Sequence, residues 1–339
     1  MQLFFRPTEN KYEGEGILPH GTFNNTNDWN PLIKYLEKGA IEFPDKTMFK
    51  MGDGNGKIIE QFTYKETNQK ANQIANYLIK NCSIQSEDKI GIFMLNSSEF
   101  VFSILATHKT GAIQVPVNKD EKGERLLYVI NYSEMKVLII DKSAIDLIEP
   151  IASKFENLER IFISGSEGSI PSSLGNINCE KFESFNNGSI DNPDIELTIA
   201  NKERCMFTSG TTGMPKGVVR EHGGVLMTVR SYIQHQGIRS DDTLMSVLSL
   251  GHANAQAMCL FAAIGAGCTA VFFPKFSASN FWKWAHDCGA TVTNFLGAVA
   301  ECLWSAKPSD YDQKHNVRIV LAGPAPRNLI ERHLLLIKL

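Results

Sequence analysis

The sequence predicts an α/β fold built from two lobes, each a mostly parallel sheet flanked by helices. The chain has 339 residues, 43% of them hydrophobic, which is enough to fill two packed cores. Short apolar runs alternate with helical patterns, as in stacked βαβ units whose crossovers make neighbouring strands parallel. Residues 164–201 are rich in Gly, Ser, Asn and Pro and lack a sustained period, which indicates a loop or a boundary between the lobes.

The first lobe is expected to comprise residues 1–200, including an N-terminal helical segment. Residues 29–80 carry a helical pattern that Pro44 and Asp45 interrupt, and the helix over 66–80 has its apolar residues on one face. Strands then alternate with helices. The expected strands are 89–95, 113–117, 137–140 and 160–163, and the expected helices are 99–109, 121–131 and 143–155.

The second lobe is expected over residues 201–339, with a new βα series that begins at Arg204. Its expected strands are 243–248, 269–273, 291–295 and 317–321, with helical segments such as 279–288 between them. No Asp, Glu, Lys or Arg occurs from Thr243 to Pro274, a stretch longer than a membrane-spanning helix. His252 and several glycines interrupt it, so we expect a buried helix followed by a strand and no membrane span.

Charge and cysteine content exclude several classes of function. The formal net charge is −3 with both signs interspersed, so no basic stripe exists and nucleic acid is not an expected partner. Seven scattered cysteines without a C-x-x-C pair indicate thiols in a reducing compartment. Arg6 and Pro7 interrupt the apolar start, so no signal peptide is expected and the predicted location is cytoplasmic. The sequence gives no indication of the oligomeric state.

Residues 208–217, Thr-Ser-Gly-Thr-Thr-Gly-Met-Pro-Lys-Gly, carry the chemistry. They follow an apolar run and precede a helical stretch that starts near His222, which indicates a strand, a loop and a helix. Glycines let the backbone approach a ligand, and successive N–H groups can form an anion-binding concavity. Four hydroxyl groups and one ammonium group complete an inventory suited to an oligophosphate; they belong to Thr208, Ser209, Thr211, Thr212 and Lys216.

Two better-known phosphate motifs do not fit this loop. In the P-loop spacing, the position five residues after Gly210 should be glycine but is Pro215, and Lys216 is followed by Gly217 instead of Ser or Thr. The dinucleotide fingerprint G-x-G-x-x-G is absent here as well. A polar surface turn without a ligand is the alternative, and it leaves the ordered run of ten residues unexplained.

The loop resembles the phosphate-binding signature shared by acyl-CoA synthetases, peptide-synthetase adenylation domains and luciferases. Every position fits, and His222 stands where that family usually carries a histidine. Residues 62–66 and 109–117 resemble the early motifs of the family, and residues 322–326 resemble its Gly-Gly-x-Pro loop with Ala322 in place of the first glycine. The resemblance covers nearly the whole chain.

The resemblance implies roles for individual residues. The loop would enclose the β- and γ-phosphates of ATP. Lys216, Thr208 and His252 would be the catalytic groups, and Thr208 would also be a ligand of Mg²⁺. His252 would line the acyl pocket beside the α-phosphate, together with the turn at 294–298. A histidine in an apolar stretch can also be a plain core residue, but His252 follows a predicted strand, where open α/β sheets bind ligands. The expected nucleotide-binding residues are Thr208, Ser209, Gly210, Thr211, Thr212, Gly213 and Lys216 for the phosphates, and Gly323, Pro324 and Ala325 for the adenine.

The reaction that the resemblance implies has two steps. A carboxylate attacks the α-phosphorus of ATP and releases pyrophosphate, and the thiol of coenzyme A then displaces AMP from the acyl-adenylate. Residues 276–282 and 290–293 look most like the carnitine- and crotonobetaine-CoA ligase group. Transfer to a carrier-protein thiol and a non-catalytic nucleotide-binding module remain the alternatives.

Several family motifs are missing after Pro326. These are the Tyr-Gly-x-Thr-Glu motif, the Asp for the ribose, the hinge and the C-terminal domain with its catalytic Lys. The expectation from the sequence is therefore a C-terminally truncated form with an incomplete second lobe and little or no ligase activity.

Overall fold

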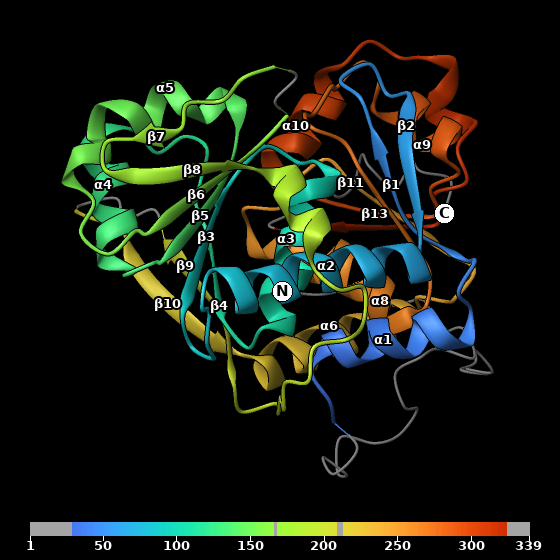
Figure 1. Ribbon diagram of the computed structural model, residues 1–339. Helices are drawn as coiled ribbons and strands as arrows, with labels where there is room; N and C mark the ends of the chain where they lie inside the picture. The colour runs from blue at the N-terminus through green and yellow to red at the C-terminus, as the bar shows by residue number, and fades with distance from the viewer. Residues whose placement is uncertain (1–28, 166–167, 209–212, 324–339) are drawn as a thin grey trace.

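The computed structural model describes residues 29–165, 168–208 and 213–323. Within these residues the strands form two sheets, which lie on either side of the molecule in Figure 1 and are covered by helices. Most neighbouring strands are parallel; the antiparallel pairs are β1 with β2, β9 with β10, and β7 with β8. This arrangement confirms the predicted fold class.

The first sheet has eight strands in the described chain, in the order β10-β9-β4-β3-β5-β6-β8-β7. Their bounds are β3 (Lys89–Phe93), β4 (Ile113–Pro116), β5 (Val137–Asp141), β6 (Arg160–Ser164), β7 (Ser173–Leu174), β8 (Ile177–Lys181), β9 (Lys202–Thr208) and β10 (Lys216–Glu221). The strands expected in the first lobe are all present, each within two residues of its expected bounds.

The second sheet has six strands in the described residues, in the order β14-β13-β11-β12-β1-β2. Their bounds are β1 (Thr47–Gly52), β2 (Ile58–Thr63), β11 (Thr243–Ser246), β12 (Thr269–Phe272), β13 (Val292–Phe295) and β14 (Ile319–Ala322). The four strands expected in the second lobe are therefore present as β11 to β14.

Helices connect the strands and cover both sheets. Those of the described chain are α1 (Leu32–Glu42), α2 (Tyr64–Asn81), α3 (Ser98–Lys109), α4 (Gly123–Tyr132), α5 (Ile145–Ile148), α6 (His222–Gln236), α7 (Ala253–Ala255), α8 (Ala262–Ala266), α9 (Phe281–Cys288) and α10 (Gly297–Ser305). A π-helical turn, η5 (Gln256–Phe261), joins α7 to α8, and short 3-10 turns flank α5. In Figure 1, α4 and α5 lie outside the first sheet at the left, and α9 lies beside the second sheet at the right.

Side chains along each strand alternate between an inner core and an outer core, as strand geometry requires. Ile139 of β5 and Phe272 of β12 belong to one shared inner core, to which α1, α2, α3, α6 and α8 contribute. The neighbouring Ile140 and Val271 instead face separate outer cores, which α4 and α9 cover respectively. Both faces of the central strands are thus buried, which explains why β3, β5 and β12 are almost continuously apolar, whereas the edge strand β10 is exposed.

Local signals set the helix boundaries. Thr63 caps α2 because its side chain accepts a hydrogen bond from the N–H of Glu66, while the Glu66 carboxylate accepts one from the N–H of Thr63. Ser97 caps α3 by accepting a hydrogen bond from the N–H of Phe100 at 3.2 Å. At the other end of α8, Gly267 adopts φ = 68°, a left-handed conformation that suits glycine.

Three parts of the sequence-based prediction were wrong in detail. Residues 29–80 are not helical throughout, because the hairpin β1–β2 separates α1 from α2. A strand, β10, lies between the phosphate loop and α6, and the segment 164–201 contains β7 and β8. These strands pair with partners that the local pattern does not reveal; Phe49 of β1, for example, lies opposite Ala270 of β12.

The sheets do not follow the order of the chain. The hairpin β1–β2 precedes residue 200 but belongs to the second sheet, and β9 and β10 follow residue 200 but extend the first. The proposed division into 1–200 and 201–339 therefore does not coincide with the division between the sheets. Each half of the chain thus contributes strands to both sheets, and the two sheets pack against one shared inner core.

The uncharged stretch forms β11, α7, η5, α8 and β12, with the helical part ending at Gly267 as expected. In the part of the chain that the structure describes, no helix combines the length and the apolar character needed to span a membrane.

Candidate functional site

The flanks of the phosphate loop form an antiparallel hairpin, β9–β10, in which Thr208 lies opposite Lys216. Both residues are exposed, and the hydroxyl of Thr208 donates to the carbonyl oxygen of Lys216 at 3.4 Å. Because β9 runs parallel to β4, the loop leaves from the carboxyl edge of the first sheet, where open α/β sheets bind ligands. Four predicted phosphate-binding residues lie outside the described residues: Ser209, Gly210, Thr211 and Thr212.

Gly213 is the first glycine of the loop that the structure describes. A Cβ atom added there would meet no described atom within 4 Å, so open space surrounds this part of the backbone. Pro215, two residues on, is buried, and Lys216 after it is exposed. The hairpin therefore presents the ammonium group, a hydroxyl and accessible backbone at one end.

His252 lies in a turn at the carboxyl end of β11, directly before α7. His252 is exposed, and its backbone N–H donates to the carbonyl oxygen of Ser249 at 3.0 Å. Asn96, which follows β3, holds this turn: its amide donates to the carbonyl of Leu248 at 2.8 Å and accepts from the N–H of Leu250 at 2.7 Å. The same amide donates to the carbonyl of Phe273 at 3.0 Å, so one side chain joins the carboxyl edges of both sheets.

The other expected residues of the acid and adenine sites lie close by. Asn294, at the end of β13, is buried and hydrogen-bonded to Asn254, two residues after His252. Gly323 follows β14, and its N–H donates to the carbonyl of Phe295 at 3.2 Å. Since β11, β13 and β14 are adjacent and parallel, their carboxyl ends bring these groups to one edge. Pro324 and Ala325 lie outside the described residues.

The sequence did not predict a buried polar cluster at the base of the hairpin, opposite its exposed tip. Its members are His108 of α3, Glu203 and Arg204 of β9, His222 of α6, and Gln256 of η5, all almost completely buried. Nε2 of His108 lies 3.3 Å from Oε1 of Glu203, and Nε of Arg204 lies 3.7 Å from Oε2. The rings of His108 and His222 meet edge to face, with centroids 5.3 Å apart.

Burial shifts the protonation of this cluster. It raises the pKa of Glu203 to about 7, although the nearby Arg204 acts in the opposite direction. It lowers the pKa of His222 to about 4 and that of His108 well below its usual range, and the positive charge of Arg204 adds to both effects. Both imidazoles are therefore neutral at pH 7. The one sequence signal was the pair of adjacent charges, Glu203 and Arg204, at the start of an apolar run.

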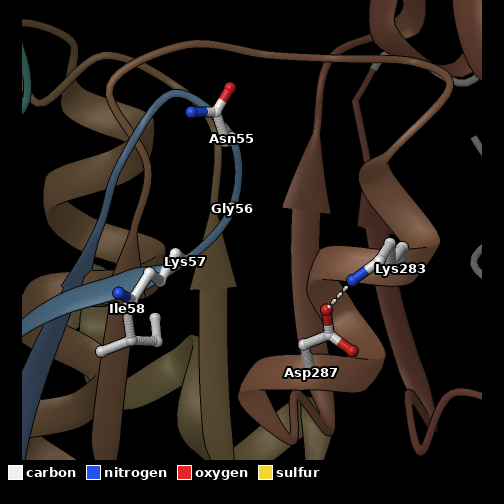
Figure 2. Close-up of a pocket in the computed structure, with 6 residues that line it drawn as sticks. All are labelled: Asn55, Gly56, Lys57, Ile58, Lys283 and Asp287. Atoms are coloured by element: carbon white, nitrogen blue, oxygen red, sulfur yellow. Dashed lines mark hydrogen bonds and ion pairs between the residues drawn. The ribbon is translucent and has the colours of Figure 1, made fainter.

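A pocket of about 430 Å³ lies elsewhere, between the turn of β1–β2 and α9 (Figure 2). In Figure 2, Lys283 and Asp287 of α9 face one another and form an ion pair. The indole N–H of Trp284 donates to the carbonyl of Asn55 at 3.0 Å, which fixes the turn beside the helix. None of the predicted site residues lines this pocket; its lining residues are Asn55, Gly56, Lys57, Ile58, Lys283 and Asp287.

The cysteines are free thiols, as expected. Within the described residues, no group of three or more His, Cys, Asp and Glu side chains is placed to hold a metal ion.

The curated proteins that this chain resembles include several CoA ligases. The chain is 26% identical over 294 residues to a crotonobetaine/carnitine–CoA ligase of Proteus mirabilis, which covers 86% of this chain and 55% of the relative. It is 30% identical over 286 residues to the medium/long-chain-fatty-acid–CoA ligase FadD6 of Mycobacterium tuberculosis, with coverages of 83% and 44%. The chain thus spans about half the length of the curated relatives it matches.

Solved structures share the fold. The anthranilate CoA ligase AuaEII in complex with anthranoyl-AMP matches with a TM-score of 0.76 at 22% identity, over 87% of this chain and 55% of that one. The N-terminal domain of FACL13 from Mycobacterium tuberculosis matches with a TM-score of 0.75 at 21% identity, over 91% and 73%.

The family model described as AMP-binding enzyme matches residues 36–333, which is most of the chain. This match includes both sheets, the phosphate hairpin and the turn of His252. The chain therefore belongs to the AMP-binding enzyme family.

Proposed function

We propose that this chain supplies the ATP- and acid-binding part of an AMP-forming acyl-CoA ligase. The observation that carries the proposal is the hairpin β9–β10, which presents Thr208 and Lys216 side by side at the carboxyl edge of the first sheet. The turn of His252 lies at the carboxyl edge of the second sheet, and Asn96 joins the two edges. A nucleotide on the hairpin would therefore have its α-phosphate directed toward the edge where an acid could bind.

The proposed role of the hairpin is to bind the β- and γ-phosphates. Lys216 offers a full positive charge, and the exposed hydroxyl group of Thr208 lies beside it, so both could stabilise the charge that moves to pyrophosphate. The roles proposed for Ser209, Gly210, Thr211 and Thr212 rest on the sequence motif. The backbone at 323–325 would lie against the adenine.

The proposed reaction begins with attack of a substrate carboxylate on the α-phosphorus of ATP. The P–O bond to pyrophosphate breaks as the bond to the carboxylate oxygen forms, and an acyl-adenylate results. His252 and Asn294 would hold the acid in line with the leaving group, which is the main demand of this chemistry. The thiol of coenzyme A would then attack the acyl carbon, lose its proton and release AMP.

Magnesium would accompany ATP and neutralise part of the phosphate charge. The hydroxyl of Thr208 is exposed and can supply one ligand. This suits an ion that takes most of its oxygen ligands from phosphates and water. Since the described residues contain no cluster of metal-binding side chains, the phosphates themselves would supply the remaining charged ligands.

Titration of ATP and Mg²⁺ into the purified chain by calorimetry tests the nucleotide site. We expect saturable binding and, for Lys216→Ala, a Kd about 10- to 100-fold higher, because a charge-assisted hydrogen bond contributes roughly 1.5–3 kcal/mol. Lys181→Ala is the matched control, since Lys181 is an exposed lysine of β8 in the same sheet. No binding, or equal affinities for the Lys216→Ala variant and the unmodified chain, would contradict the proposal.

Pyrophosphate exchange tests the acid site and the substrate class. Labelled pyrophosphate is returned to ATP only when an acid forms an adenylate, so a panel containing crotonobetaine, carnitine, anthranilate and fatty acids of several lengths identifies the substrate. Adding coenzyme A or a carrier-protein thiol afterwards distinguishes the two possible acceptors. Exchange that does not depend on any acid would argue against adenylation.

A further inference from the structure

Gln256 is a polar side chain with 0% exposure, in the π-helical turn η5 that follows α7. Its Oε1 accepts a hydrogen bond from Nη1 of Arg204 at 3.1 Å, and its Nε2 donates to the carbonyl oxygen of Leu250 at 2.8 Å. Both ends of the amide are thus engaged, and these partners fix its orientation. Turns of π-helix are rare and occur frequently at functional sites.

The two partners of Gln256 belong to the two segments assigned above to ATP and to the acid. Leu250 lies two residues before His252, in the same turn. Arg204 lies at the base of β9, and the strand runs from it to Thr208, a span of ~13 Å at the usual rise per residue. One buried amide therefore joins the base of the phosphate hairpin to the turn of His252.

Packing alone does not explain an amide at this position. An apolar side chain of similar size would fill the same volume without the cost of burying polar atoms. The need of the buried Arg204 for a hydrogen-bond acceptor explains only one of the two hydrogen bonds of Gln256. The other, from Nε2 to the carbonyl oxygen of Leu250, holds the turn of His252. Asn96 anchors that turn separately, so the turn stays attached to both sheets when the Gln256 contact is lost.

We propose that Gln256 is a positioning residue that sets the turn of His252 relative to the phosphate hairpin. The assignment of these two segments to acid and nucleotide rests on the proposed function. The linkage itself is a property of the unliganded protein, so it can be tested without ATP.

Hydrogen–deuterium exchange of the full chain tests the linkage through two variants. Gln256→Leu removes both contacts, and we expect exchange to rise about tenfold in residues 248–252 and also to rise in residues 202–206, because a lost hydrogen bond costs roughly 1–1.5 kcal/mol. Gln256→Glu keeps an acceptor for Arg204, which holds the carboxyl ionised, but cannot donate to Leu250. In this variant, hydrogen–deuterium exchange should rise in residues 248–252 and stay at the level of the unmodified chain in residues 202–206.

The control is Gln61→Leu, since Gln61 is an exposed glutamine of β2. It should exchange like the unmodified chain in both segments. Far-UV circular dichroism confirms that each variant is folded, and the Glu variant retains a partner for Arg204 if the Leu variant does not fold. Wild-type exchange of residues 248–252 in Gln256→Glu would overturn the inference.

ATP adds a second readout. In the unmodified chain, nucleotide bound at the hairpin should slow exchange in residues 248–252 as well. In Gln256→Leu we expect ATP to bind with a Kd within about threefold of the unmodified chain, while this remote protection falls at least about fivefold. Equal remote protection in both proteins would overturn the coupling. Failure of the unmodified chain to bind ATP would instead contradict the proposed function, with the exchange results in the absence of nucleotide still deciding the linkage.

Discussion

The two ends of the hairpin β9–β10 differ in how they use polar residues. At the tip, Thr208 and Lys216 are exposed, and their charge and hydroxyl are available to a ligand. At the base, Glu203, Arg204 and His222 are buried and contact His108 of α3 or Gln256 of η5. From this difference we expect substitutions at the tip to affect ligand binding more than stability, and substitutions at the base to affect stability more than binding.

Removing the buried cation gives the largest expected difference between the two ends. Arg204→Met should lower the free energy of unfolding by about 3 kcal/mol, because it leaves the Glu203 carboxyl without its opposite charge and Gln256 without its donor. Lys216→Ala should change that free energy by less than about 0.5 kcal/mol. Urea denaturation of both variants at pH 7 measures the two changes in the free energy of unfolding. Equal changes would contradict the expected difference in stability between the tip and the base.

Lowering the pH should destabilise the folded protein through the buried histidine at the base of the hairpin, His222. The pKa of His222 is lowered to about 4 in the folded protein, so the unfolded chain binds more protons below its ordinary pKa of about 6.5. The stability linked to this group is present above pH 6.5 and is lost as the pH falls toward 4. Between pH 7 and pH 5 the loss from His222 is about 2 kcal/mol.

His222→Asn removes this titration, so the variant should lose about 2 kcal/mol less than the unmodified chain between pH 7 and pH 5. The buried Glu203 acts in the opposite direction, since its raised pKa favours the folded state as the pH falls from 7. Urea denaturation at the two pH values measures the difference. His235→Asn, at an exposed position of the same helix, is the control, and an equal pH dependence for His222→Asn and this control would contradict the expectation.

A change at the tip should alter binding alone. Thr208→Val keeps a β-branched residue in the strand but removes the hydroxyl that donates to Lys216, so the free energy of unfolding should change by less than about 0.5 kcal/mol. If the hydroxyl contacts phosphate, ATP should bind about fivefold more weakly, since one neutral hydrogen bond contributes roughly 1 kcal/mol. Calorimetry and denaturation on the same sample separate the two effects.

The smallest effect is expected at an exposed position of β10 between the tip and the base, opposite Cys205. Val219 of β10 is 49% exposed, so Val219→Thr should change the free energy of unfolding by less than about 0.5 kcal/mol and leave ATP affinity within about twofold. Val115→Thr is the matched change in the buried strand β4, where an added hydroxyl costs roughly 1–3 kcal/mol. Similar costs at both positions would mean that β10 is covered in the folded protein.

Much of the fold could be predicted because its signals are local. The strand expected at 269–273 is β12 (Thr269–Phe272), and the helix that begins near His222 is α6, since each forms from a contiguous apolar or helical pattern. The hairpin β1–β2 was missed because its parallel partner, β12, lies far along the chain. Strand pairing of this kind depends on contacts that periodicity within a short segment does not report.

The candidate site divides in the same way. The sequence alone identified the family and predicted a phosphate loop, because ten consecutive residues carry the glycines, hydroxyls and ammonium group that such a loop needs. Only the tertiary structure placed Gln256 between Arg204 and Leu250, and Asn96 between the two sheets. The backbone conformation and the hydrogen-bond donors of a loop are set by the residues of the loop itself and their neighbours in the sequence. The burial of a polar side chain and its hydrogen-bond partners depend instead on which distant elements of the chain pack around it.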